Sequence, residues 1–483
     1  MQRSNRVLMA RTALHSARIS RRGFLGGIAA AAATVIVPRH VLGGAGHVPP
    51  SEKTTLAGIG VGGQGIQNMI RFQQFPEIQV VAVCDVNRES GGYLSWNWSQ
   101  GKETRLAGRE PARRVIDEAY AKEKGVGKYR GCQAYADYRE LLEKEDVDAV
   151  MVATPDHCHA MITLAAIARG KHVYCEKPLT YSVYEARQVA EAARRAKVAT
   201  QLGNQGQASE EDRLVREFIL AGAIGPVHEV KILWGGAFWA GPEWDGRPPE
   251  TPPVPDGLDW DLWLGPAPAR PYHPAYHPWR WRDWWDFGTG QIGDMGCHKL
   301  STVFKALKLA HPTSVEAKCD DLNAEIYPRR FEIHYEFPAR DGMPPVKLSW
   351  YNGGLLPPPP KYLEPGRKMA GDLYIGETGA LMGHRIVPES RMQDYGPPPK
   401  VLPRSVGHDK EFVDACRGGE PAGSDFVAHS GLLTETALLG NVALRAGKRL
   451  EWDGPNCKIT NDAEANALLH RKYREGWKLK AES

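Results

Sequence analysis

A glycine-dense turn between an apolar run and an amphipathic run constrains this fold more than any other sequence feature. Residues 56–59 are typical of a buried β-strand, and apolar side chains recur at helical spacing after residue 65. Between these runs, Gly60, Gly62 and Gly65 match the G-x-G-x-x-G pattern. In this pattern the glycines permit a tight turn, the approach of a pyrophosphate, and close packing of helix on strand. We therefore predict a dinucleotide-binding turn.

The next apolar run, residues 79–84, ends in Asp85. A carboxylate roughly 20 residues after the glycines is placed to bind the hydroxyls of a ribose. The glycine pattern alone also occurs in ordinary glycine-rich loops. Its combination with a second strand that ends in Asp85 favours a dinucleotide site over that alternative.

The first 46 residues have a different character from the rest of the chain. Arg21 and Arg22 precede an apolar stretch, residues 26–37, that is too short to span a membrane as a helix. This order is typical of a twin-arginine export signal, and it predicts a periplasmic or otherwise exported protein. The alternatives are a disordered basic tail and an uncleaved membrane anchor. Removal of the signal would leave no stable membrane span.

The export signal also accounts for the basic charge of the chain. Residues 1–46 contain seven arginines and no acidic residue, so their removal changes the formal net charge from +4 to −3. The remaining chain therefore has no basic excess that would indicate a nucleic-acid partner. The eight cysteines lack C-x-x-C spacing, which argues against a structural zinc site, and no disulfide pairing can be assigned.

The order of predicted elements divides the chain after the signal into two domains. Strands alternate with helices from residue 52 to residue 206, which predicts a doubly wound, parallel Rossmann-type sheet. Residues 207–455 contain longer alternating strands, which predict an α+β domain with a large, open, mainly antiparallel sheet. We expect residues 89–131 to be an insertion, whose first half, with Tyr93, is a loop over the cofactor edge or a subunit contact. Residues 456–483 are expected to form a C-terminal tail.

Polar residues follow three predicted strands of the first domain, at the edge where such sheets bind ligands. These turns are residues 154–159, Glu176-Lys177-Pro178, and Asn204-Gln205 after Gly203. Most lysines lie on the surface, but Lys177 follows a buried strand and is held between a carboxylate and a proline. There it could donate to a substrate hydroxyl oxygen and stabilise a developing alkoxide.

A second chemical candidate opens a predicted helix that begins near residue 288 and continues to Leu307. Asp294 and His298 are four residues apart, so they share one face of this helix. The carboxylate could orient the imidazole as a general base. The alternative is an aspartate cap with a structural histidine one turn later. A metal site is not predicted, because no third ligand is evident.

The tryptophans of the chain are concentrated just upstream of this helix. Residues 279–286 alternate aromatic with charged side chains, and Trp281, Arg282 and Trp284 are the candidate substrate contacts there. Aromatic faces beside hydrogen-bonding groups suit a sugar. A packed aromatic loop or an oligomer contact explains the run equally well. We also expect Asn204 and Gln205 to contact substrate.

Together these motifs resemble the Gfo/Idh/MocA oxidoreductases, the family of glucose–fructose oxidoreductase and inositol dehydrogenase. The resemblance covers roughly residues 54–450, and Glu176-Lys177-Pro178 is its most specific part. It implies that Lys177, Asp294 and His298 are catalytic, and that the protein is a homo-oligomer, a dimer or a tetramer. Asp85 suggests NAD, whereas Arg88 leaves NADP as an alternative. The cofactor contacts it implies are Gly60, Gly62, Gln64, Gly65, Ile66, Asp85, Thr154, Pro155, His159, Glu176 and Lys177.

The expected function combines this resemblance with the export signal. We expect an NAD(P)-dependent oxidoreductase that acts on a hydroxyl of a sugar, polyol or glycoside. No exchangeable NAD pool is expected outside the cytoplasm, so we expect the cofactor to be retained. Two alternatives remain: an NAD-dependent glycosidase that uses transient oxidation, and a non-catalytic sugar-binding protein of the same fold.

Overall fold

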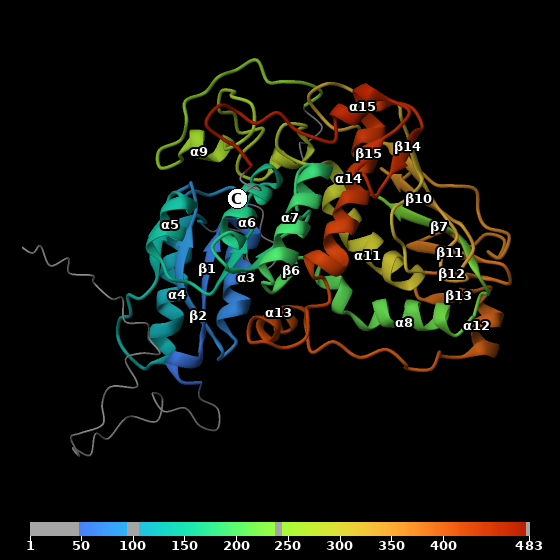
Figure 1. Cartoon of the computed structure of the whole chain (residues 1–483), viewed down its shortest axis with the longest axis horizontal. Coiled ribbons are helices and arrows are strands. Elements are labelled where there is room, and N and C mark those ends of the chain that lie inside the picture. The colour runs from blue at the N-terminus through green and yellow to red at the C-terminus, as the bar shows by residue number, and fades with distance from the viewer. Residues whose placement is uncertain (1–47, 94–105, 237–243, 480–483) are drawn as a thin grey trace, which may run out of the picture. The chain divides into compact units, whose positions relative to one another are not determined.

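The computed structural model describes residues 48–93, 106–236 and 244–479 (Figure 1). The chain divides into two compact units, residues 1–51 and 52–483, and the second unit contains all of the sheets. The predicted export signal, residues 1–46, lies outside the described residues. Within the described ranges, no helix is long and apolar enough to cross a membrane. A short 3-10 turn, η1 (Pro50–Glu52), precedes the first strand.

The first sheet is the parallel Rossmann-type sheet that the sequence predicts. Its strand order is β3-β2-β1-β4-β5-β6, and all pairs are parallel. This order reverses between β1 and β4, and ligands of such sheets bind outside the strand ends at that reversal. The six strands are β1 (Thr54–Ile59), β2 (Ile78–Cys84), β3 (Gln133–Tyr135), β4 (Ala149–Val152), β5 (His172–Cys175) and β6 (Thr200–Leu202).

Helices cover both faces of this sheet, as is required where the strands are buried on both sides. All four residues of β4 are buried. Helix α7 (Val183–Ala196) shows how the sequence sets a boundary: Ser182 and Glu185 form a capping box, and Lys197 ends the helix at a φ of 53°. The other helices of this half are α3 (Gly63–Gln73), α4 (Arg109–Glu123), α5 (Tyr138–Lys144) and α6 (Asp156–Ile167).

The second sheet is open, mixed and mainly antiparallel, as predicted. Its order is β13-β12-β11-β7-β10-β9-β8-β14-β15, and only β7 and β10 pair in parallel. The strands are β7 (Val227–Trp234), β8 (Ser314–Cys319), β9 (Phe331–Phe337), β10 (Val346–Asn352), β11 (Asp372–Gly376), β12 (Ala380–Met382), β13 (Arg385–Val387), β14 (Leu450–Asp453) and β15 (Lys458–Ile459).

The helices of the second half connect the two sheets. Helix α14 contacts α7 of the first half and β8 of the second, and one apolar core runs through both halves. Helix α13 returns late in the chain to pack Phe412 and Val413 against the first sheet (Figure 1). These elements are η2 (Gln205–Ala208), α8 (Glu210–Leu220), α9 (Trp260–Leu264), η3 (Arg280–Asp283), α10 (Gly290–Asp294), α11 (Gly296–Leu307), α12 (Glu389–Tyr395), α13 (His408–Cys416), the π-turn η4 (Phe426–Ser430), α14 (Gly431–Ala446) and α15 (Ala463–Ala467).

Three sequence expectations change in detail. The single helix predicted from residue 288 onward is two helices, α10 and α11, which join at Met295. The predicted tail contributes β15 and α15 and buries Ala465 and Leu469 in the core. The predicted domain boundary at residue 206 falls within η2. Of the predicted insertion, residues 94–105 lie outside the described part, and the remainder includes α4.

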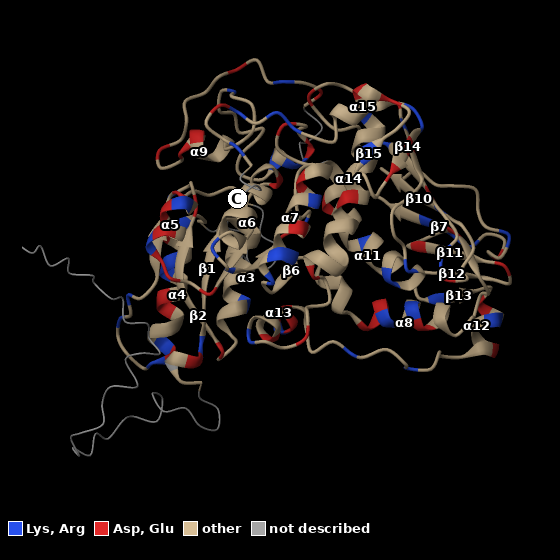
Figure 2. Ribbon diagram, viewed as in Figure 1, with Lys and Arg blue, Asp and Glu red and all other residues tan. Residues whose placement is uncertain are grey.

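Charged side chains of both signs are interspersed along the outer helices (Figure 2). Helix α8, for example, carries three acidic residues in its first turn and two arginines beyond them. The strands and inner helices of the first half are largely uncharged in the same view.

Candidate active site

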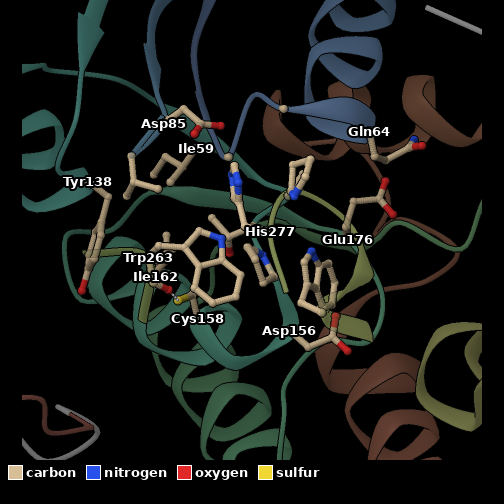
Figure 3. A pocket seen from close by; sticks show the side chains of 18 of the residues that line it. Ile59, Gln64, Asp85, Tyr138, Asp156, Cys158, Ile162, Glu176, Trp263 and His277 are labelled. Carbon is tan, nitrogen blue, oxygen red and sulfur yellow. Dashed lines mark hydrogen bonds between the residues drawn. The ribbon is translucent and has the colours of Figure 1, made fainter. Parts of the chain in front are cut away.

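A concave site lies at the carboxyl ends of the first sheet. Its lining comes from the ends of β1, β2, β4 and β5, from the segment 262–282, and from Asp294 at the end of α10. The cavity has a volume of about 130 Å³. Figure 3 shows Asp85, Tyr138 and Cys158 toward one end, Gln64, Glu176 and Asp156 toward the other, and Trp263 and His277 between them.

The glycine turn fits a dinucleotide on steric grounds. Gly60 has a φ of +81°, and a Cβ there would lie 2.6 Å from the backbone of Ala153. A Cβ on Gly65 would lie 1.8 Å from the carbonyl oxygen of Gly60, so only glycine allows this approach of α3 to β1. Gly62 caps α3 without a side-chain hydrogen bond, which leaves the N-terminal N–H groups of the helix for an anion. Gly60, Gly62 and Gln64 line the cavity, whereas Gly65 and Ile66 support it from behind.

Asp85 lies at the end of β2 and lines the same cavity. Its Oδ1 accepts from the backbone N–H of Asn87 at 2.9 Å. Burial raises the pKa of this carboxyl to about 6, against the opposing effects of that N–H and of Arg109. A ribose bound here would donate hydrogen bonds from its hydroxyls to this buried carboxylate. Arg88 is exposed and does not line the cavity.

Two of the predicted cofactor residues, His159 and Glu176, form hydrogen bonds with neighbouring residues of the protein. His159 is fully buried and joins two turns, with Nδ1 2.6 Å from the Pro178 oxygen and Nε2 2.8 Å from the Thr154 oxygen. Glu176 accepts from Asn68 Nδ2 at 2.8 Å, and its carboxylate still lines the cavity. Thr154 and Pro155 also line the cavity. His159 therefore holds in place the turns that carry Thr154 and Lys177.

The two halves of the chain meet at Lys177 and Asp294. Lys177 Nζ donates to Asp294 Oδ1 at 2.6 Å, and Arg282 Nε lies 3.9 Å from Asp294 Oδ2. Burial alone would lower the pKa of Lys177, but the carboxylates of Asp294 and Glu176 raise it above its usual value. Burial opposes ionisation of Asp294, yet Lys177 and Arg282 lower its pKa. The pair is therefore ionised and lies within the cavity.

His298 lies close enough to this pair to feel its charges, but it does not line the cavity. Burial, followed by the positive charge of Lys177, lowers the pKa of His298 to about 3. The imidazole is therefore neutral near pH 7. The structure shows no hydrogen bond between Asp294 and His298. Asp294 Oδ1 accepts from Lys177 instead, and the role of Asp294 in orienting His298 stays a prediction.

Asp156 is a third carboxyl of this site that sequence reasoning did not select. It starts α6, is 4% exposed, and accepts from Thr289 Oγ1 at 2.5 Å. Burial raises its pKa to about 7; the Thr289 hydroxyl opposes that shift, whereas the charge of Asp294 reinforces it. The sequence feature that could have identified Asp156 is its position after β4. It lies in the same turn as Thr154 and Pro155, which were predicted to contact the cofactor.

The predicted substrate residues fall into two groups. Trp281 and Arg282 line the cavity, with the guanidinium of Arg282 4.3 Å from the ring of Trp281. Trp284 does not reach the cavity: it is fully buried in an aromatic cluster and donates to the Ala275 oxygen at 2.8 Å. Asn204 is buried and donates to the Cys297 oxygen, and Gln205 donates to Tyr174 at 3.0 Å. Neither lines the cavity.

Three further aromatic side chains line the cavity, and only the segment of Tyr93 was expected to lie near the cofactor. Tyr93 packs against Gly62, and its hydroxyl lies 3.2 Å from His277 Nε2. Trp263 and Trp477 approach from segments far along the chain, and Trp477 is held by the guanidiniums of Arg139 and Arg474. No local motif marks the two tryptophans, because only the tertiary fold brings them to the cavity.

Comparisons with known proteins identify both halves of the chain. The sequence profile described as "oxidoreductase family, NAD-binding Rossmann fold" matches residues 92–204. The profile described as "oxidoreductase family, C-terminal alpha/beta domain" matches residues 211–343. Both belong to the Gfo/Idh/MocA group, and together they cover about half of the chain.

Individual relatives match over shorter stretches. A 1,5-anhydro-D-fructose reductase of Ensifer adhaerens is 35% identical over 144 residues, 30% of this chain and 41% of the relative. A glycosyl hydrolase family 109 protein of Saccharopolyspora erythraea is 29% identical over 224 residues, 44% of this chain and 42% of the relative. The chain thus aligns with less than half the length of these curated relatives.

A solved structure resembles the fold over most of the chain. The WlbA dehydrogenase of Bordetella pertussis, in complex with NADH and UDP-GlcNAcA, aligns with a TM-score of 0.52 at 18% identity. The alignment covers 83% of this chain and 99% of that protein. At this identity the likeness concerns the fold, and it agrees with the Rossmann-type sheet followed by an open sheet.

Proposed function

Because the chain belongs to the Gfo/Idh/MocA family of NAD-binding oxidoreductases, we propose that it oxidises or reduces a hydroxyl-bearing carbon of a sugar, polyol or glycoside. One observation supports this most directly. Lys177 from the first half and Asp294 from the second form a 2.6 Å ion pair inside the cavity that the glycine turn lines. A non-catalytic binding protein would not require a buried ammonium beside the dinucleotide turn.

The residues at the turn and at Asp85 fit NAD. The N–H groups at the start of α3 would hold the pyrophosphate, and Asp85 would accept from ribose hydroxyls. Tyr138 lies at the Asp85 end of the cavity, where its ring would contact the adenine, and Trp263 lies between the two ends (Figure 3). When bound, NAD supplies a hydride acceptor. The exposed Arg88 does not reach this end of the cavity, which favours NAD over NADP.

The chain's own groups then have separate tasks. The Lys177 ammonium, fixed by Asp294, would donate to the substrate oxygen and stabilise negative charge as it develops there. His298 is neutral and near the pair, so its imidazole is able to accept the hydroxyl proton of the substrate. In this proposal the Asp294 carboxylate positions the Lys177 ammonium and not the His298 imidazole. Trp281 and Arg282 supply an aromatic face and hydrogen-bond donors for the substrate.

We propose further that the cofactor is retained between turnovers. Tyr93, Trp263 and Trp477 all line the cavity. Tyr93 comes from the long connection between β2 and α4, and the two tryptophans come from outside the β-α units of the first sheet. Tyr93 spans the cavity from Gly62 to His277, and Trp477 is anchored through Arg474, whose Nε donates to the Gly265 oxygen at 2.9 Å. Release of a dinucleotide would require these contacts to open. Retention suits a protein exported through the twin-arginine route and acting as a homo-oligomer, both of which stay proposals.

Cleavage of a glycoside through transient oxidation is the second candidate. It needs a group that protonates the leaving oxygen near neutral pH. Asp156 supplies such a group, because its pKa is about 7 and it lines the same cavity as Lys177. The family 109 glycosyl hydrolase among the relatives is consistent with this candidate.

One experiment separates these functions. The purified protein is incubated with aldoses, polyols and aryl glycosides, and both NADH absorbance and released aglycone are followed. An oxidoreductase changes the ratio of NADH to NAD and leaves glycosides intact. A glycosidase releases aglycone without net formation of NADH. Lys177→Met should abolish either activity while the NAD content of the protein stays unchanged; full activity in that variant would overturn the assignment.

A further inference from the structure

A second cavity lies on the opposite side of the segment that lines the candidate active site. Trp281 and Arg282 line the first cavity, whereas Trp285 and Asp286 line the second. The two cavities share no lining residue, and the second has a volume of about 340 Å³. We refer to it as the basic–aromatic cavity, defined by Tyr181, Trp285, Tyr327, Asn441, Arg445 and Arg471.

The charge of this cavity is unbalanced. Arg445, Arg471 and Lys472 line it together with a single carboxylate, Asp286, and Asp286 is already paired with Arg270. Within the described part of the chain, neither Arg445 nor Arg471 has a carboxylate oxygen within 4.0 Å. Among the described residues, no carboxylate pairs with Arg445 or Arg471, so the cavity carries a net positive charge.

The two arginines stack on aromatic rings and do not pair with carboxylates. The guanidinium carbon of Arg471 lies 4.2 Å from the ring centre of Tyr181, and that of Arg445 lies 5.5 Å from the ring of Trp285. Arg471 Nη1 donates to the His157 oxygen at 3.1 Å, and its Nε is buried without a partner. Stacking of this kind orients a guanidinium and leaves its N–H donors for a planar anion.

The uncharged part of the lining contains a buried hydrogen-bond acceptor without a donor. Asn441 is 7% exposed, and its Nδ2 donates to the Thr289 oxygen at 2.9 Å. That bond fixes the amide, and the buried Oδ1 has no partner. An amide oxygen accepts, so the missing partner is a donor such as a hydroxyl. Asn441 and Arg445 are one turn apart on α14, so both face the same ligand space.

We propose that the basic–aromatic cavity binds a hydroxylated organic anion of the sugar-acid class. The carboxylate would pair with Arg445 and Arg471, and a ring hydroxyl would donate to Asn441 Oδ1. An inorganic anion would satisfy the arginines but would leave the amide oxygen without a donor. This site does not depend on the proposed reaction.

Isothermal titration calorimetry with three probes tests the proposal: D-glucuronate, D-glucose and inorganic phosphate. We expect saturable binding of glucuronate, and at least about tenfold weaker binding of both glucose and phosphate, because each lacks part of the recognised chemistry. The variant Arg445→Gln should lower glucuronate affinity at least about tenfold. Arg445 is exposed, so this change leaves the core intact, which a thermal melt verifies.

Two controls make the result decisive. Arg195→Gln removes another exposed arginine outside the cavity and should leave binding unchanged. Lys177→Met alters the candidate active site and should also leave glucuronate binding unchanged, which separates the two cavities. No glucuronate binding, phosphate binding of equal affinity, binding that survives Arg445→Gln, or binding lost in Lys177→Met would each overturn the proposal.

Discussion

The carboxyl of Asp156 should make the stability of the protein depend on pH in a way that one substitution removes. Burial raises its pKa from 3.8 to about 7 in the folded chain. At about 1.4 kcal/mol per pKa unit, full ionisation costs the folded state about 4 kcal/mol. Below pH 3.8 the group is protonated in both states and adds no such cost. The cost grows as the pH rises, and it is complete above about pH 7.

The variant Asp156→Asn cannot ionise and keeps an oxygen that accepts from Thr289. Its free energy of unfolding, relative to the unmodified protein, should therefore rise by about 3 kcal/mol between about pH 5 and about pH 8. Urea unfolding followed by circular dichroism at each pH measures this difference. Asp146→Asn is the control, because its side chain is 94% exposed and it removes the same formal charge.

Two outcomes would refute the reasoning. The first is a stability difference between Asp156→Asn and the unmodified protein that is the same at both pH values. The second is a pH dependence in Asp146→Asn as large as that in Asp156→Asn. Either result would mean that the buried site does not hold Asp156 in its neutral form, and the glycosidase alternative would lose its candidate acid.

Further predictions concern the cofactor cavity. Lys177→Met should lower kcat by about 10²–10⁴-fold, measured by steady-state turnover, because it removes a positioned proton donor. The kcat/KM profile of the unmodified protein should show an inflection near pH 7 that Asp156→Asn lacks, because His298, with a pKa of about 3, does not titrate there. Gly65→Ala should prevent retention of NAD, as quantified after denaturation, because its Cβ would lie 1.8 Å from the Gly60 oxygen. Trp477→Ala should speed release of bound NAD at least about tenfold in a chase with excess unlabelled cofactor, because it uncovers the cavity.

The first half of the chain could be predicted well because its signals are local. The glycine turn, the buried strand β4 and the capping box of α7 each lie within a few consecutive residues. The very short strands β12, β13 and β15 were missed, because two or three residues carry no readable periodicity.

The candidate site, like the fold, could be predicted from the sequence only in part. Lys177 and Asp294 were selected separately, and the fold places them 2.6 Å apart. The direction of the Asp294 carboxylate could not be predicted, because it depends on the break at Met295 and on a partner 117 residues away. Trp263 and Trp477 were missed for the same reason: their roles depend on contacts between distant segments. The tryptophan run was divided by the fold, with Trp281 in the cavity and Trp284 in the core.

The central claim is that this protein holds NAD as a resident group and reduces it with electrons from a hydroxyl-bearing substrate. The most direct measurement uses the protein as purified, without added cofactor, mixed with a panel of sugars and polyols while the near-ultraviolet absorbance of NADH is recorded. The account predicts that at least one substrate produces a single burst of NADH absorbance no larger than the protein concentration, and that Lys177→Met produces none. NADH formation only after NAD is added, together with no nucleotide released on denaturation, would contradict the claim.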